Sequence, residues 1–211
     1  MVNGVRVATK KSAGKSQAFQ PGALLEMVVY HHELNQLQRI KEYKWSTIYQ
    51  NIYSNVPVNA VALFMIELLS KSLKQPEPNP ELFEFVERSF ITLDQSRGTV
   101  LANLPIYFAL HLSHFFGFRI DDNFSTNQLF LDLQEGVFVS EHPSHPDFLE
   151  GKQAETVAKF LKVKRKEELE QILLHHDFRR SLLFHIEKYY AFHISEFGSL
   201  RSLPVLRELL S

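Results

Sequence analysis

Hydrophobic and polar residues follow one pattern near the start of the chain and another in the rest of it. Apolar residues alternate with polar ones, or form short β-branched runs, at positions 2–7, 24–30 and 37–45. Polar stretches at 10–16 and 31–36 separate these runs. Runs of this length between polar breaks are typical of strands joined by turns. The pattern therefore predicts a small β module of three short strands over residues 1–46.

Beyond residue 46 the apolar positions recur every three or four residues, as they do along one face of a helix. The clearest stripe runs from Val58 to Leu73. Pro57 suits the first turn of this helix, where a missing N–H removes no hydrogen bond. Pro76 and Pro78 follow the stripe, and proline cannot continue a helix. We therefore expect one amphipathic helix to end just before these prolines.

Two further helices follow in the sequence. The tripeptide Asn-Pro-Glu at 79–81 supplies a cap, a first helical residue and a first-turn acid, and predicts a helix that buries apolar residues at 82–90. Residues 101–116 form the next apolar stretch, and Gly117 stands where a left-handed residue often closes a helix. Pro105 either begins this third helix or kinks it, and the pattern leaves both alternatives open.

The helical pattern is lost between residues 119 and 150. Two short apolar runs around a Gln-Glu-Gly turn predict a hairpin near 129–139. Helices resume in four segments, at 153–161, 166–175, 180–194 and 203–210. The predicted fold class is therefore α+β and predominantly α, with a β module at 1–46 and a helical domain at 47–211.

Composition narrows the functional classes. The formal net charge is −1, so the whole chain is not a general polyanion binder, yet residues 1–25 hold four cations and no acid. Cysteine is absent, which excludes disulfides, thiolate zinc sites and cysteine nucleophiles. Basic residues without an apolar run at the start do not fit a secretion signal. Glu26 and Glu67 interrupt the apolar stretches that we considered as membrane spans, so we expect a cytoplasmic protein without a membrane partner.

The cationic stretch at 9–16 reads Thr-Lys-Lys-Ser-Ala-Gly-Lys-Ser. Its ending resembles a phosphate-binding P-loop, but Thr9 stands where that motif requires glycine. The Phe-Gln-Pro-Gly segment at 19–22 also prevents the helix that must follow. Two interpretations remain equally supported: a basic loop that contacts nucleic-acid phosphates, and a solvated surface loop.

Histidine and carboxylate patterns do not predict a catalytic or metal site. Ten histidines are present, including His111 and His114 at helical spacing and the adjacent His175 and His176. A metal site needs further ligands, and no HExxH motif or suitably spaced carboxylate supplies them. We expect one buried and one exposed histidine in the 111/114 pair. The nucleophile elbow, the dinucleotide loop and the kinase motifs are also missing, so binding is favoured over catalysis, with no cofactor.

The order of several short motifs resembles the RecO family of recombination mediators over essentially the whole chain. In the N-terminal part the similar segments are Val-Asn-Gly-Val-Arg at 2–6, the Lys/Ser-rich stretch, and Phe-Gln-Pro at 19–21. In the helical part they are 62–69, 78–83, 110–118, 189–193 and 200–206. The resemblance implies a partial OB-fold, a barrel that binds single strands, followed by a RecO-type helical domain.

Members of this family bind single- and double-stranded DNA, anneal complementary strands and act with RecR in loading the recombinase RecA. They also bind the acidic-hydrophobic tail of the single-stranded-DNA-binding protein. The resemblance implies backbone contacts to DNA from the cations of the first module, which are Arg6, Lys10, Lys11 and Lys15. Either base stacking or a place in the barrel core is implied for three aromatic residues, which are Tyr30, Tyr43 and Trp45.

The partner tail suits an apolar groove of the helical domain flanked by a cation. The candidates for its basic edge are Arg179, Arg180 and Arg201. An alternative interpretation is a helical protein-interaction module that binds this tail and has lost DNA binding.

Two departures from the family pattern change the expectations. Many members carry a four-cysteine zinc module in the region that corresponds to residues 119–150, so we expect the hairpin and local packing to hold this region without zinc. The first two strands of the barrel are also not represented before Met1. An open three-stranded remnant exposes strand edges and apolar surface, so we expect residues 1–46 to be poorly stable by themselves and to bind DNA weakly.

Overall fold

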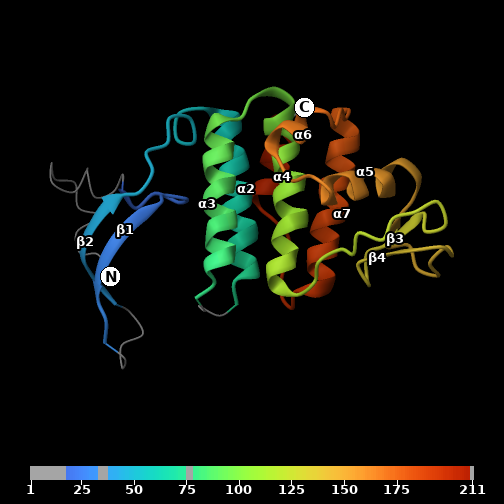
Figure 1. Cartoon of the computed structure of the whole chain (residues 1–211), viewed down its shortest axis with the longest axis horizontal. Coiled ribbons are helices and arrows are strands. Elements are labelled where there is room, and N and C mark those ends of the chain that lie inside the picture. The colour runs from blue at the N-terminus through green and yellow to red at the C-terminus, as the bar shows by residue number, and fades with distance from the viewer. Residues whose placement is uncertain (1–17, 33–37, 75–77, 210–211) are drawn as a thin grey trace. The chain divides into compact units, whose positions relative to one another are not determined.

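The computed structural model describes residues 18–32, 38–74 and 78–209 of the chain (Figure 1). The chain divides into two compact units, Met1–Gln50 and Asn51–Ser211. The division falls close to the boundary at residue 46 expected from the change in hydrophobic pattern. The α+β, mostly helical fold class is confirmed, because the described strands are few and short and helices make up most of the second unit.

The first unit contains an antiparallel pair of strands, β1 (Leu25–Tyr30) and β2 (Arg39–Trp45). Their register runs from Leu25 opposite Trp45 to Tyr30 opposite Arg39, with an irregularity between Val28 and Val29. These strands match the second and third strands expected from sequence. The strand expected at 2–7 lies outside the described residues. Most of β1 is exposed, including Met27 at 50% and Tyr30 at 52%, so this pair buries little apolar surface of its own.

The second unit begins with two helices that asparagines cap, α2 (Val56–Ser72) and α3 (Pro80–Gln95). The side chains of Asn55 and Asn79 accept hydrogen bonds from the backbone N–H groups three residues later, and a proline occupies the first turn of each helix. The apolar stripe of α2 is buried, with Val61, Met65 and Leu68 fully enclosed. The cap at Asn79 was predicted from sequence, and the structure adds an equivalent cap at Asn55.

The central helix of this unit is α4 (Gly98–Leu112), which contacts α2, α3, α5, α6 and α7. Pro105 lies inside α4 and therefore does not begin the helix, which leaves the kink as the remaining alternative. A 3-10 turn, η1 (Ser113–Phe116), extends α4 to Gly117, whose φ of 81° gives the left-handed closure predicted from sequence. The segment Gly98–Phe116 is long and apolar enough to cross a membrane by length and composition, which was not expected from sequence. More than half of it is buried inside the bundle, as expected of a core helix.

The region without helical pattern contains a small sheet of β3 (Phe130–Asp132), β4 (Val137–Val139) and β5 (Phe148–Leu149), in the order β4–β3–β5. The first two strands form the hairpin expected near 129–139. A series of polar contacts links this sheet to the loop before β5 and to α7. Nε2 of His145 lies 3.1 Å from Asp132, its Nδ1 accepts from the N–H of Asp147, and Lys188 donates to the Asp147 carboxylate over 2.9 Å.

Four helices complete the unit, namely α5 (Gly151–Leu161), α6 (Lys166–Glu170), α7 (His176–His193) and α8 (Ser202–Leu209). The sequence pattern predicted that α6 would continue to residue 175. It ends earlier because the Asn103 side chain donates to the carbonyls of Leu169 and Ile172, which are therefore satisfied without further helical turns. In Figure 1, α2, α3, α4 and α7 run side by side as a bundle, and α5 lies across it.

Helix α8 is anchored to α2 by an acidic cap from a distant part of the chain. The Glu67 carboxylate accepts hydrogen bonds from the N–H of Arg201 over 2.9 Å and from the N–H and hydroxyl of Ser202 over 2.8 and 2.6 Å. Burial raises the pKa of Glu67, but the hydrogen bonds from Ser202 and Arg201 outweigh it and lower the pKa overall. An anionic group at a helix N-terminus stabilises the helix, so Glu67 fixes the last helix to the bundle.

Candidate functional site

The cations predicted to contact DNA, Arg6, Lys10, Lys11 and Lys15, lie outside the described residues. The aromatic candidates of the same unit lie in β1 and β2. Tyr30 is 52% exposed and therefore available for stacking. Tyr43 instead packs edge-to-face on Phe19, with ring centroids 4.8 Å apart, and Trp45 is only partly exposed. Among the three, Tyr30 is the residue whose surface suits a base.

The arginines predicted to flank a partner groove occupy three different environments. Arg179 is buried, at 7% exposure, and donates to the Asn103 side chain and to the carbonyl of Leu174. It therefore cannot form a basic edge on the surface in this structure, and that expectation is wrong for this residue. Arg180 donates to the carbonyl of Arg207, and Arg201 is exposed. Neither residue lines any of the three hollows described below.

A run of exposed cations lies instead at the end of α5, in the following turn and at the start of α6. We call residues 159–166 the basic ridge. The segment reads Lys-Phe-Leu-Lys-Val-Lys-Arg-Lys and contains no acid. Three of its cations have carboxylate neighbours: Lys159 with Glu155 at 2.7 Å, Lys162 with Asp122 at 3.6 Å and Arg165 with Glu168 at 3.2 Å. Exposed pairs of this kind are weak and screened by salt, so the cations stay available to an anionic partner.

One side of the basic ridge borders a hollow of about 560 Å³, which we call the lysine groove. Its apolar lining comes from Val163, Ile172 and neighbouring leucines, of which Leu173 is 78% exposed. Its charged lining consists of Lys152, Lys159, Lys162 and Glu168. An apolar surface surrounded by three cations and one acid matches a peptide that combines apolar and acidic residues.

The other side of the basic ridge borders a smaller hollow of about 310 Å³ between α3, α4 and α6, which we call the tyrosine pocket. Phe85, Leu104 and Tyr107 form its apolar part. The polar groups at its edge are Glu81, Glu84, Arg88, Lys164 and Lys166. Burial raises the pKa of Tyr107, and the nearby negative charge of Glu168 raises it further. The Tyr107 hydroxyl therefore remains a hydrogen-bond donor at neutral pH.

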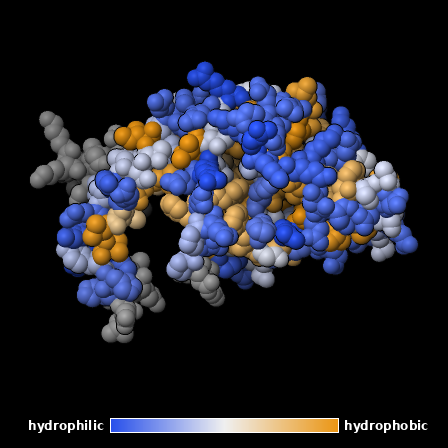
Figure 2. Space-filling model, viewed as in Figure 1, coloured by the Kyte–Doolittle hydropathy of each residue, from blue (hydrophilic) through white to orange (hydrophobic). Residues whose placement is uncertain are grey.

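A third hollow, of about 590 Å³, lies where α2, α3, η1 and α7 meet. Three phenylalanines line it, and Phe118 stacks on His193 with ring planes 2° apart. Lys74 and Glu196 are its charged residues, so the hollow has no excess of either charge. Figure 2 shows a mostly hydrophilic surface on one face of the helical unit, interrupted by smaller hydrophobic patches.

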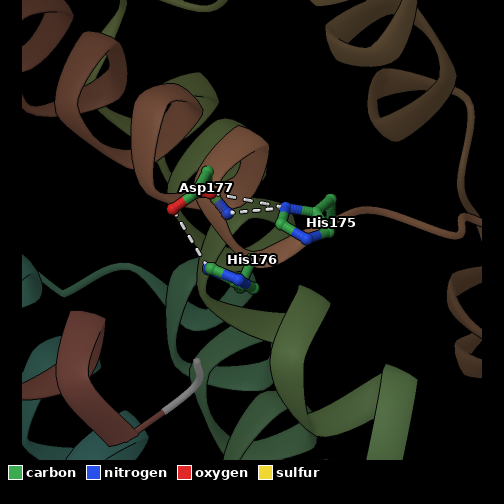
Figure 3. A group of neighbouring side chains, drawn as sticks. All are labelled: His175, His176 and Asp177. Atoms are coloured by element: carbon green, nitrogen blue, oxygen red, sulfur yellow. Dashed lines mark hydrogen bonds and ion pairs between the residues drawn. The ribbon is translucent and has the colours of Figure 1, made fainter.

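The adjacent histidines at the start of α7 form a small cluster with Asp177 (Figure 3). His175 Nδ1 caps the helix by accepting from the Asp177 N–H, and His176 Nδ1 lies 3.1 Å from the Asp177 carboxylate. Arg180 lies 3.7 Å from the same carboxylate. The positive end of the helix and this guanidinium both oppose a bound cation. The arrangement thus serves as a helix cap, and the absence of a metal remains a prediction.

The other histidine pair behaves as expected. His111 is mostly enclosed, its Nε2 lying 3.1 Å from the carbonyl of Phe160, and His114 is exposed.

The basic ridge was not predicted from sequence, although its charge pattern is present there. Five cations within residues 159–166, without an acid among them, distinguish this segment from the balanced charges elsewhere in the helical domain.

Comparison with known proteins agrees with this architecture. The sequence model described as Recombination protein O C terminal matches residues 54–204, which include all the helices of the second unit up to the start of α8. A protein named DNA repair protein RecO from Azobacteroides pseudotrichonymphae genomovar. CFP2 is 27% identical over 195 residues, covering 90% of this chain and 78% of that protein.

Two further relatives carry the same name. The protein from Phocaeicola vulgatus is 28% identical over 203 residues, covering 96% of this chain and 83% of the relative. The protein from Christiangramia forsetii is 29% identical over 209 residues, covering 99% of this chain and 85% of the relative. The sequence model matches more than half of this chain, so the chain belongs to the RecO family of DNA repair and recombination proteins.

Proposed function

We propose that the protein is a recombination mediator that binds single- and double-stranded DNA, promotes strand annealing and assists recombinase loading with RecR. The observation that carries this proposal is the extent of the similarity to proteins named DNA repair protein RecO. It reaches 99% of this chain and therefore includes the β unit as well as the helical domain. The action is by binding, in the cytoplasm, without catalysis or a cofactor.

In this proposal the β unit belongs to an OB-fold that contacts the DNA backbone. The cations Arg6, Lys10, Lys11 and Lys15 neutralise phosphates without reading sequence. The exposed ring of Tyr30 supplies a stacking surface for an unpaired base. A direct test is the annealing of complementary oligonucleotides: the protein accelerates annealing, and a variant without Lys10, Lys11 and Lys15 loses most of the acceleration.

The lysine groove supports a second activity, the binding of the acidic-hydrophobic tail of the single-stranded-DNA-binding protein. Acidic residues of the tail pair with Lys152, Lys159 and Lys162, and an apolar side chain packs on Val163 and Leu173. Calorimetric titration of a peptide of this composition tests the assignment. An interaction module that has lost DNA binding is the alternative function, and it predicts peptide binding without annealing.

A further inference from the structure

We propose that Lys164, Arg165 and Lys166, together with the tyrosine pocket, form a second binding site for single-stranded nucleic acid, located on the helical domain. Phosphates lie on these three cations and one unstacked base enters the pocket. The inference rests on the proposed function only in that the protein binds nucleic acid. It adds a surface that is separate in sequence from the N-terminal cations.

The charge distribution supports a backbone contact at this position. All three side chains are exposed, and they are consecutive, with Lys166 as the first residue of α6. Among the described residues, no carboxylate lies within ion-pairing distance of the Lys164 or Lys166 ammonium, while Arg165 has only the exposed pair with Glu168. Free ammonium groups are the ones that gain most from a phosphate, because their charge is otherwise uncompensated.

The adjoining pocket supports a contact with a base. Its volume of about 310 Å³ exceeds what one nucleobase needs, and Lys164 and Lys166 are part of its edge. Phe85 and Tyr107 provide aromatic surface, and Phe85 is held in place by stacking on Phe108, with ring centroids 5.4 Å apart. Aromatic rings beside a line of cations are the usual components of sites for single-stranded nucleic acid.

The acids at the pocket edge favour a base over a second phosphate. Glu84 pairs with Arg88 across 2.5 Å, and Glu81 lies in the first turn of α3. Both carboxylates repel phosphate but accept hydrogen bonds from the exocyclic amino groups of a base. A base inside a duplex cannot enter such a pocket without unstacking, so this site favours single strands over double strands.

The test is fluorescence anisotropy of a labelled single-stranded oligonucleotide, titrated with the full chain at several salt concentrations. The variant Lys164→Ala/Lys166→Ala removes two phosphate contacts, and its plot of log affinity against log salt is expected to be less steep by about 1.4, at about 0.7 per contact. The matched control is Arg97→Ala/Arg119→Ala, which removes two exposed cations elsewhere in the helical domain and is expected to leave the slope unchanged.

A pair of Tyr107 variants tests the base contact. Tyr107→Leu is expected to lower the affinity for single strands about 5- to 100-fold, as loss of one stacked base does, while Tyr107→Phe keeps the ring and most of the affinity. For a blunt duplex, the loss of affinity in Tyr107→Leu should be smaller than the loss for single strands.

Four results overturn the inference. The first is a Lys164→Ala/Lys166→Ala variant that folds normally and keeps the wild-type salt slope. The second is an equal loss in the arginine control, which shows that only net charge matters. The third is a wild-type chain that binds no oligonucleotide, which also removes the proposed DNA function. The fourth is binding that depends only on Lys10, Lys11 and Lys15, which leaves the proposed function intact.

Discussion

The guanidinium of Arg179 on α7 donates its Nε–H to the side-chain oxygen of Asn103 on α4 over 3.3 Å, inside the helical domain. Asn103 in turn donates to the carbonyls of Leu169 and Ile172 at the end of α6. Arg179 and Asn103 are both buried. This pair therefore joins three helices. Arg179, which was expected from sequence to be a surface cation, has a structural role.

Replacing Arg179 with alanine is expected to destabilise the helical domain. Asn103 loses a charge-assisted partner, and hydrogen bonds to charged groups contribute about 1.5–3 kcal/mol. The measurement is the free energy of unfolding in urea, compared with that of Arg201→Ala, which removes an exposed arginine and is expected to change it by less than about 0.5 kcal/mol. Equal stabilities for Arg179→Ala and wild type would show that the buried pair is not needed.

Gly136 in the turn between β3 and β4 is expected to resist substitution. Its φ is 71°, and a Cβ there would lie 2.8 Å from the Tyr189 hydroxyl, which is held by its hydrogen bond to the carbonyl of Phe118. Gly136→Ala therefore suffers both left-handed strain, about 1–2 kcal/mol, and a steric clash. Gly98→Ala is the matched control, since its φ is 52° but nothing lies within 4 Å. Similar unfolding free energies for the two variants would contradict the clash.

The stability of the helical domain is expected to decrease on mild acidification. Burial lowers the pKa of His111, against the opposing hydrogen bond with Phe160, and burial likewise lowers the pKa of His185. The folded state then binds fewer protons than the unfolded state, so stability is full above the usual histidine pKa near 6.5 and decreases as the pH falls below it. Urea unfolding between pH 7.5 and 5.5 measures this slope.

The His111→Gln variant is expected to have a smaller slope than the wild-type chain over the same pH range. Gln keeps a donor that can reach the Phe160 carbonyl but has no titrating proton. An unchanged slope in this variant would assign the pH dependence to other groups.

Neutralising the lysine groove is expected to weaken binding of the acidic-hydrophobic tail peptide. Lys152→Ala/Lys159→Ala removes two of the three cations that line it, and each rim charge contributes about 0.2–1 kcal/mol, so the combined loss in affinity is roughly 2- to 30-fold. Calorimetry measures the affinity. Arg180→Ala/Arg201→Ala is the control. A larger loss of affinity in this control would indicate that the tail peptide binds beside these arginines and not in the lysine groove.

Local signals explain why most helices could be predicted from sequence. Asn79, followed by proline and glutamate, marks the start of α3, and Gly117 marks the end of the α4–η1 segment. The hairpin around Gly136 was equally visible in its turn residues. These features depend on neighbours in the chain, so their physical causes can be read without tertiary information.

The features that could not be predicted depend on distant residues. The early end of α6 follows from a side chain on α4, and the start of α8 is fixed by Glu67 on α2, 135 residues before Ser202. The burial of Arg179 likewise depends on Asn103. The hollows beside the basic ridge exist only because α3, α4, α5 and α6 meet there, although the ridge itself is a local charge pattern.

The most direct test of the proposed mediator function is the salt dependence of single-stranded oligonucleotide binding by the full chain, measured by fluorescence anisotropy. We predict salt-sensitive binding in the wild-type protein. In Lys10→Ala/Lys11→Ala/Lys15→Ala the slope should fall by about 2, at about 0.7 per lost phosphate contact. A folded wild-type protein that binds no oligonucleotide at low salt, yet still binds the tail peptide, would contradict the mediator function and favour an interaction module.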